Sequence, residues 1–177
     1  MMGLAYERAF RDAQAIQEYQ AAEKAEPDFP GVHSDLGLVY WRRDEINRAK
    51  AEFEQELRRF PADPVSNCLL GEIELRQSQP AIARAHFQVA LNGNRRYKEA
   101  WQGLGKAEIM LRDPQGALAP LRRAIALDPK LAQAHYLLAD ALEELGQTAQ
   151  ARKERAISAQ IQAEQQARYT QKLNSPH

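Results

Sequence analysis

The feature that most constrains this chain is an internal repeat with a fixed period of 34 residues. When the sequence is shifted against itself by that period, four columns of similar residues align without an insertion. The first column is small: Gly3, Gly37, Gly71, Gly105 and Ala139. The second is alanine throughout: Ala15, Ala49, Ala83, Ala117 and Ala151. The third is aromatic or apolar until its last member: Tyr19, Phe53, Phe87, Leu121 and Arg155. The fourth is proline with one exception: Pro27, Pro61, Arg95 and Pro129.

Each repeat is predicted to be a pair of helices. Strong helix formers dominate the composition, no stretch alternates at period two, and apolar residues keep helical spacing on both sides of Arg112–Asp113–Pro114. Asp113 is suited to cap the second helix, and Pro114 occupies its first position, where a missing N–H costs little. Helix pairs of this kind must stack to bury their apolar faces. The sequence therefore predicts an all-α solenoid.

One residue conflicts with this pattern. Pro120 lies inside the second helix of its repeat and removes a backbone hydrogen bond. We expect Pro120 on an outer face, at a kink and not at a helix boundary.

Composition argues against several functional classes. Lysine plus arginine and aspartate plus glutamate each number 24, so the formal net charge is zero and no nucleic-acid partner is expected. The single Cys68 excludes an internal disulfide and a cysteine metal cluster. No apolar stretch approaches the roughly 20 residues that span a bilayer, so no membrane insertion is expected. Because no secretion signal is visible either, the chain as given favours a cytoplasmic location.

Groups that could perform chemistry are scattered along the repeat. His33 and His135 share a register but lie three repeats apart, too far to share a metal, and each is expected to fill the place that Trp101 holds. The chain contains no HExxH motif, no GxSxG motif and no phosphate-binding glycine loop. We therefore expect no catalytic residue, no metal ligand and no cofactor.

The repeat resembles the tetratricopeptide repeat, a 34-residue helix–turn–helix unit. The resemblance covers nearly the whole chain and depends on two segments. The first carries Leu36, Gly37, Tyr40, Ala49, Phe53 and Pro61; the second carries Trp101, Leu104, Gly105, Ala117, Leu121, Ala124 and Pro129. The departures are Glu56 in place of a small residue, Arg95 in place of proline, and Glu74 and Glu108 in place of Tyr40. The resemblance implies a right-handed superhelix of antiparallel helix pairs, whose first helices line a concave groove that binds proteins and has no reaction centre.

The repeat frame divides the single domain, residues 1–177, into about five units. The first is partial and the others are complete: about 1–29, 30–63, 64–97, 98–131 and 132–158. A long helix is expected to follow to about residue 173, before a disordered tail over 174–177. Its thin apolar stripe of Ile157 and Ile161 favours a polar cap on the array, and the alternative is a dimerising or partner-binding helix.

The candidate groove consists of the first-helix residues that point away from the core. It comprises Leu38, Trp41, Arg42, Glu72, Leu75, Arg76, Gln102, Lys106, Ile109, Tyr136 and Asp140. Trp41, Leu75 and Ile109 exceed what the core needs, and the alternative is that they fill the space between neighbouring first helices. The positive charges come early and the negative ones late in the chain, which favours an amphipathic peptide or helix as partner. Repeats that grip chaperone tails use Lys and Asn at places held here by Ser34, Leu38, Cys68 and Leu69, so that clamp is absent.

The leading expectation is a non-catalytic scaffold that binds an unidentified protein or peptide in this groove. The rival is a self-associating structural module, monomeric or weakly associated through its repeat ends, and a third possibility is an accessory region of a larger protein.

The opening residues MMGLAYERAF fit the same frame. Gly3 and Tyr6 occupy the columns of Gly37 and Tyr40, so they are expected in the middle of a first helix that lacks five residues, the equivalents of 30–34. The chain is then either a fragment of a longer array, which we favour, or one whose first repeat is naturally trimmed.

Overall fold

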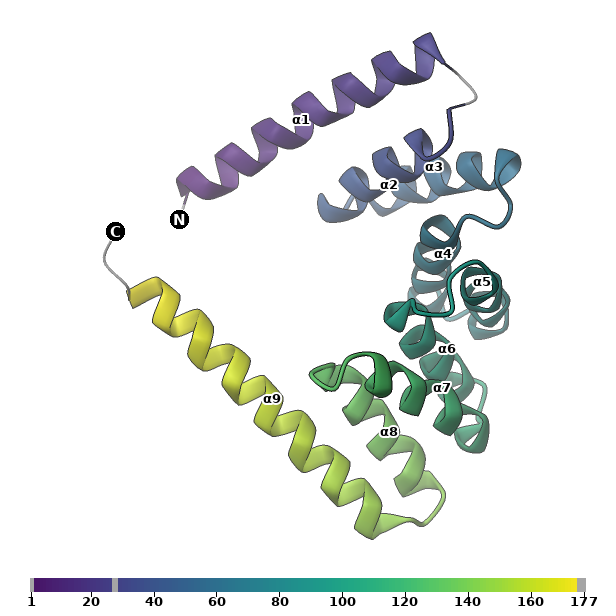
Figure 1. The fold of residues 1–177 in the computed structure, drawn as a ribbon, viewed down its shortest axis with the longest axis vertical. Coiled ribbons are helices and arrows are strands. Elements are labelled where there is room, and N and C mark those ends of the chain that lie inside the picture. The colour runs from purple at the N-terminus through teal and green to yellow at the C-terminus, as the bar shows by residue number, and fades with distance from the viewer. Residues whose placement is uncertain (1, 27–28, 175–177) are drawn as a thin grey trace.

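The computed structural model describes residues 2–26 and 29–174, with side chains described for 11–26 and 29–171. This part of the chain is helical and contains no strand (Figure 1). The helices are α1 (Met2–Ala25), α2 (Val32–Arg42), α3 (Ile46–Arg59), α4 (Pro64–Arg76), α5 (Pro80–Gly93), α6 (Lys98–Met110), α7 (Pro114–Leu127), α8 (Ala132–Glu144) and α9 (Thr148–Asn174).

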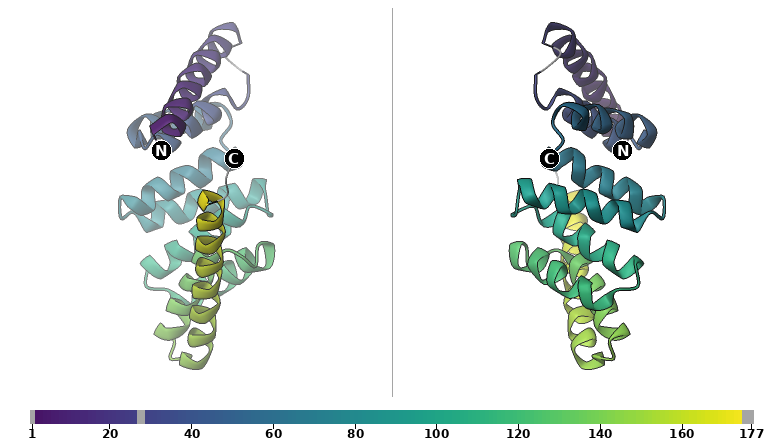
Figure 2. Two further views of the ribbon diagram at one scale, coloured as in Figure 1. Left: turned by 90° about the vertical axis from the view of Figure 1, so that its left-hand side faces the viewer. Right: turned by 90° about the vertical axis from the view of Figure 1, so that its right-hand side faces the viewer.

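The helices form a solenoid in which each packs chiefly on its neighbours in sequence. The tightest partners are the pairs α2 with α3, α4 with α5, α6 with α7 and α8 with α9. First helices also touch the first helices of adjacent pairs, which makes the stack continuous. The long α1 and α9 project from the two ends toward the same side (Figure 1), and α9 passes in front of the stack when this side faces the viewer (Figure 2).

In the pairs α2 with α3, α4 with α5 and α6 with α7, the glycine column lies directly under the aromatic or apolar column. A Cβ atom added to Gly37 would come within 2.4 Å of the Phe53 ring, and one on Gly105 within 2.4 Å of Leu121. Both facing side chains are fully buried. The predicted close crossing of the two helices is therefore confirmed, and it requires the absence of a side chain at the glycine position.

The turn inside each pair depends on a second column. Asp44, Ser78, Arg112 and Gly146 are spaced by one repeat, and all have positive φ, between 59° and 74°. After this residue the second helix begins, with proline in its first turn in α5 and α7. The predicted cap is confirmed, since the Asp113 carboxylate accepts a hydrogen bond from the Gly116 N–H at 2.8 Å.

The first repeat has no such turn, and here the sequence prediction is wrong. The expected remnant of a separate first helix is instead continuous with the second, as the single helix α1 from Met2 to Ala25. The residue in the positive-φ column of this repeat is Phe10. A bulky aromatic residue rarely adopts the left-handed conformation, which aspartate, serine and glycine tolerate better; Arg112 is the long residue that adopts it here. The helix therefore continues through the place where the other repeats turn.

The departures from the family pattern have structural partners. Glu56 is buried, and its Oε1 accepts a hydrogen bond from the N–H of Gly31, the N-cap residue of α2, at 2.9 Å. The Arg95 carbonyl accepts one from the Trp101 indole at 3.0 Å. The other two departures, Glu74 and Glu108, form ion pairs across the junctions between repeats, with Lys50 at 2.8 Å and Arg84 at 3.6 Å.

The residues at the positions of Lys50 and Glu74 match each other in every repeat junction. At the same two positions the junction nearest the N-terminus has Ile16 and Tyr40, and the one nearest the C-terminus has Leu118 and Leu142. Apolar residues thus face apolar residues at the outer junctions, and bases face acids at the inner ones. This pairing explains why Glu74 and Glu108 replace tyrosine.

Pro120 does not end α7, as predicted, but its expected position on an outer face is wrong. The residue is buried. It occupies the register of His86 and Glu154, which bond to the first helix of their own pair. In this repeat Trp101 stands at the register of Asn67 and His135, the first-helix partners of His86 and Glu154.

The chain ends in one long helix. Ala151, Ser158 and Ile161 are buried, and the Ser158 hydroxyl donates a hydrogen bond to the Ala132 carbonyl of α8 at 2.9 Å. All described side chains after Ile161 are exposed. The first part of α9 therefore covers α8, while Asn174 still belongs to the helix and the rest of the expected tail, 175–177, lies outside the described residues.

Replacing Gly71 by alanine should destabilise the fold by about 1–2 kcal/mol, although alanine is the better helix former. The added Cβ would lie 2.8 Å from the buried Phe87 ring. Urea unfolding followed by circular dichroism measures the change. The exposed Ala85→Gly variant of α5 calibrates helix propensity alone, and Phe87→Leu in the G71A background should recover part of the loss. A G71A protein that unfolds at a higher urea concentration than the wild type would contradict the close contact.

Candidate partner-binding groove

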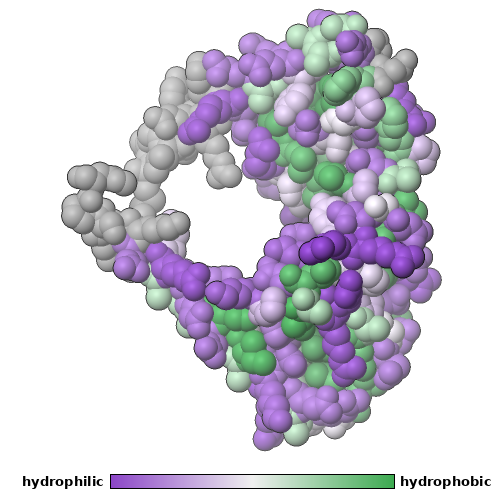
Figure 3. Space-filling model, in the orientation of Figure 1, coloured by the Kyte–Doolittle hydropathy of each residue, from purple (hydrophilic) through white to green (hydrophobic). Residues whose placement is uncertain are grey.

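The candidate groove residues come from the four first helices α2, α4, α6 and α8. Successive first helices contact one another, so their outward faces form one continuous strip along the stack. The stack is hollowed on the side toward which α9 projects (Figure 3). Among the described residues, no helix is long and apolar enough to cross a membrane.

Trp41 and Arg76 form a contact between two first helices. The Arg76 guanidinium lies 4.3 Å from the centre of the Trp41 ring, and Trp41 is half-buried against the core around Phe53. Stacking on an aromatic ring is favourable for a guanidinium and holds it in place. The pair presents a flat, charged surface and joins α2 to α4.

Two of the three residues that looked surplus to the core instead fill the space between helices. Leu75 is only 4% exposed and belongs to the core cluster around Phe87, so it offers no surface to a partner. Ile109 packs partly buried against the cluster around Leu121. Cys68 is also in the core, where burial raises the pKa of its thiol to about 12. Leu75 and Ile109 therefore pack between helices, which was the alternative to contact with a partner.

The charged groove residues have partners within the chain. Arg42 donates a hydrogen bond to buried Asp12 of α1 at 2.9 Å, and Asp140 accepts one from Arg155 of α9 at 2.9 Å. Glu72 is half-buried, and burial raises its pKa despite the opposing charges of Lys106 and Arg76. The charge gradient seen in the sequence is therefore reduced by internal pairing. These partners were missed because they lie on other helices, although Arg155 is marked in the sequence as the break in its column.

The apolar surface of the groove lies mainly on α6 and α8. Tyr136 is 45% exposed and Met110 is 37% exposed. Among the described residues of α2, α4, α6 and α8, Tyr136 and Met110 are the two large hydrophobic residues that are exposed. Leu38 and Gln102 are half-buried, and the Gln102 Oε1 atom is buried without a hydrogen-bond partner. Glu143 and Glu144 at the end of α8 are exposed.

The buried histidines stabilise helix pairs. His33 donates from Nδ1 to Glu52 at 2.8 Å, and His135 donates from Nδ1 to Glu154 at 2.6 Å. Each bond joins the first and second helix of one pair. In the part of the chain that the structure describes, no group of three or more His, Cys, Asp or Glu residues is placed to hold a metal ion. Both histidines therefore join the two helices of their own pair.

Comparison with known families and structures agrees with the repeat frame. A model described as TPR repeat matches residues 11–43, and two models described as tetratricopeptide repeat match 121–153 and, overlapping, 34–103 and 68–132. No curated protein sequence matches the chain.

Among solved structures, the crystal structure of MamA is 19% identical, with 86% of this chain and 89% of that chain covered and a TM-score of 0.72. YrrB, described as a TPR protein with an unusual peptide-binding site, is 21% identical over 88% of this chain and 80% of its own, with a TM-score of 0.71. PilF of Pseudomonas aeruginosa is 19% identical over 90% and 73%, with a TM-score of 0.74. At these identities the likeness shows the fold.

Glu72→Gln should remove a loss of stability that occurs as the pH rises. Because burial raises the pKa of Glu72 in the folded state, the folded chain holds a proton that the unfolded chain has released between the ordinary pKa and the raised one. Stability therefore falls with pH through that window, and glutamine has no proton to lose. Urea unfolding from pH 4 to 8 measures the effect, with exposed Glu143→Gln as the control. A wild type and an E72Q variant with parallel stability profiles would contradict a buried Glu72.

Proposed function

We propose that this chain, which belongs to the tetratricopeptide repeat family, is a non-catalytic scaffold that binds a peptide or helix of a partner protein. The binding surface is the outward face of α2, α4, α6 and α8. The family match covers more than half of the chain and its solved neighbours share the fold. A fold does not by itself determine a function, so the proposal depends on the residues of the surface.

The observation that carries the proposal is the exposure of Met110 and Tyr136. Tyr136 is a groove residue of α8, and Met110 of α6 has the register of the groove residues Arg42 and Arg76; the two helices touch each other. Tyrosine and methionine are enriched at protein interfaces, because an aromatic ring gives a large rigid contact and a thioether adapts to varied shapes. Tyr136 lies near the start of α8 and Met110 at the end of α6, so the two side chains mark the apolar extent of the proposed site, which is centred between them.

The polar surroundings favour a partner with a basic side chain beside an apolar one. Glu143 and Glu144 are exposed on α8 near this centre in sequence, whereas Arg42 and Asp140 are already paired within the chain. The partner is thus oriented by the acidic end of α8 and by the stacked Trp41–Arg76 pair at the other end. YrrB, which shares the fold, is described as having a peptide-binding site.

Replacing Tyr136 and Met110 together by alanine should weaken binding of a groove peptide by at least about tenfold, because exposed anchors at an interface centre carry most of its energy. The probes are peptides of 16 residues selected from a displayed random library on the wild-type chain, and fluorescence anisotropy gives their affinities. Ile82→Ala is the matched control, since Ile82 is 49% exposed on the second helix α5. Selected peptides that lose affinity with I82A and keep it with the double variant would contradict the assignment.

A second function, self-association through a repeat end, is supported by the exposed face of α1. Ala22 is exposed, whereas the same column is buried at Glu56, Ala90 and Ala124. Phe29 is exposed beside it and lines a shallow pocket with Ala22, Ala25 and Glu26. In the other repeats the equivalent face is covered by a first helix.

Sedimentation velocity at several concentrations tests this second function. If α1 stacks on another copy, the sedimentation coefficient should rise with concentration, and Phe29→Ser should suppress the rise because it removes exposed apolar surface. Ile157→Ser on α9 is the control. A constant monomer coefficient over the whole concentration range would eliminate self-association through this end.

A further inference from the structure

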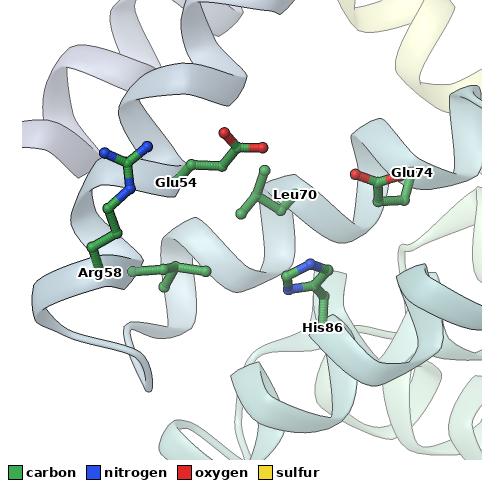
Figure 4. A pocket seen from close by; sticks show the side chains of 6 residues that line it. Glu54, Arg58, Leu70, Glu74 and His86 are labelled. Atoms are coloured by element: carbon green, nitrogen blue, oxygen red, sulfur yellow. The ribbon is translucent and has the colours of Figure 1, made fainter.

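A pocket lies on a different face of the molecule from the groove. It has a volume of about 350 Å3 and is lined by Glu54, Leu57, Arg58, Leu70, Glu74 and His86 (Figure 4). These residues belong to two second helices, α3 and α5, and to α4 between them. On α4, Leu70 and Glu74 are each two residues from groove residue Glu72, which places them on the opposite side of the helix.

The pocket contains a buried carboxylate oxygen without a partner. Glu74 is 5% exposed, and its Oε1 accepts a hydrogen bond from Lys50 at 2.8 Å. Its Oε2 atom is buried and has no hydrogen-bond partner. A buried acceptor left unpaired is costly, so a donor that enters the pocket gains more than it would at an exposed carboxylate.

The second acceptor is fixed by a chain of hydrogen bonds. The Asn67 Nδ2 donates to the carbonyls of Pro61 and Asp63, both at 2.9 Å. Its Oδ1 must therefore be the atom that faces His86 Nδ1 at 3.0 Å, so Nδ1 carries the proton. Burial lowers the pKa of His86, although the nearby carboxylates of Glu74 and Glu54 oppose this shift. The ring is neutral at pH 7, and its Nε2 is an acceptor.

The remaining lining gives the pocket a polarity. Glu74 and His86 lie at one end of the pocket, Arg58 lies at the other end, and the Glu54 carboxylate lies between them (Figure 4). Lys50 donates to Glu74 Oε1 and to Gln77 Oε1 at 3.3 Å. The pocket therefore has acceptors at one end and in its middle, and Leu57 and Leu70 supply apolar walls.

We propose that this pocket binds a primary alkylammonium group, such as the side chain of a lysine from a partner protein. An ammonium has three N–H donors and no acceptor, which matches the acceptors of Glu54, Glu74 and His86. Its aliphatic stem packs against Leu57 and Leu70, as lysine stems do along apolar surfaces. An anion does not fit this set as well, because Glu54 and Glu74 carry negative charge and the Lys50 ammonium already donates to Glu74 and Gln77.

The next junction provides a matched control within the chain. Glu108 occupies the same position on α6 and also has a buried Oε2 without a hydrogen-bond partner, beside Arg84. At that junction Gln88 stands at the place of Glu54, and Pro120 at the place of His86. The combination of Glu54, Glu74 and His86 is therefore particular to the pocket between α3 and α5, and Glu108→Gln reproduces the loss of a largely buried carboxylate without touching the pocket.

The test uses the full chain and two small probes, N-acetyl-lysine methylamide and N-acetyl-norleucine methylamide, which differ by the ammonium. Binding is followed through the methyl NMR resonances of Leu57 and Leu70. The lysine probe should produce saturable shifts and the norleucine probe should produce none. Glu54→Gln and Glu74→Gln should each weaken the lysine probe by about tenfold, whereas Glu108→Gln should leave it within about twofold, since a charge-assisted hydrogen bond contributes about 1.5–3 kcal/mol.

Further measurements distinguish a lysine of a partner protein from a free amine, and they keep the proposal testable if one variant does not fold. A lysine-containing peptide of ten residues that binds more tightly than n-butylammonium assigns the pocket to a protein partner, and equal affinities assign it to a free amine. Glu54 is exposed, so the E54Q variant decides if E74Q does not fold. Equal shifts from the lysine and norleucine probes, or E54Q with wild-type affinity, would overturn the proposal. Because the groove is not involved, Tyr136→Ala with Met110→Ala should leave the lysine probe unaffected.

Discussion

The close crossing of the two helices in each repeat is the constraint on which the rest of the structure depends. A glycine without a Cβ atom lets the ring or the leucine of the second helix lie directly against the first helix, and that side chain is then fully buried. The crossing fixes how far apart the helices of a pair lie, and the polar couples His33–Glu52 and His135–Glu154 hold the same pairs together. Once the orientation of the two helices in a pair is fixed, the side of the first helix that points away from the core is fixed too, and these sides together form the candidate groove.

The junctions between repeats are built by a different rule. Outer junctions pair apolar residues, while inner junctions pair Lys50 with Glu74 and Arg84 with Glu108. In both pairs the carboxylate is largely buried while the basic side chain reaches solvent, and a largely buried carboxylate that loses its partner is costly. The inner junctions are thus able to specify the order of the repeats. At one of them an additional histidine and an additional glutamate turn the same arrangement into a pocket with unmet acceptors.

Much of this fold follows from the sequence because a repeat samples each position several times. The glycine column predicted the close contacts, and Asp113 with Pro114 predicted a cap that the structure confirms. The continuity of α1 was not predicted, although Phe10 stands where every other repeat has a residue that tolerates positive φ. Pro120 was misplaced because helical spacing alone did not show that its register, shared with His86 and Glu154, faces the first helix of the same pair.

The candidate groove was harder to predict than the fold. Helical spacing gives the direction of a side chain but not what the next helix places against it, so Leu75 is in the core and Arg42 is paired with Asp12. A crystal structure of the chain with one of the selected peptides shows whether a partner binds on the first helices at Met110 and Tyr136. We expect a peptide that contacts both side chains along α6 and α8. A peptide seated on α3, α5 and α7, or against α1, would contradict the proposed groove.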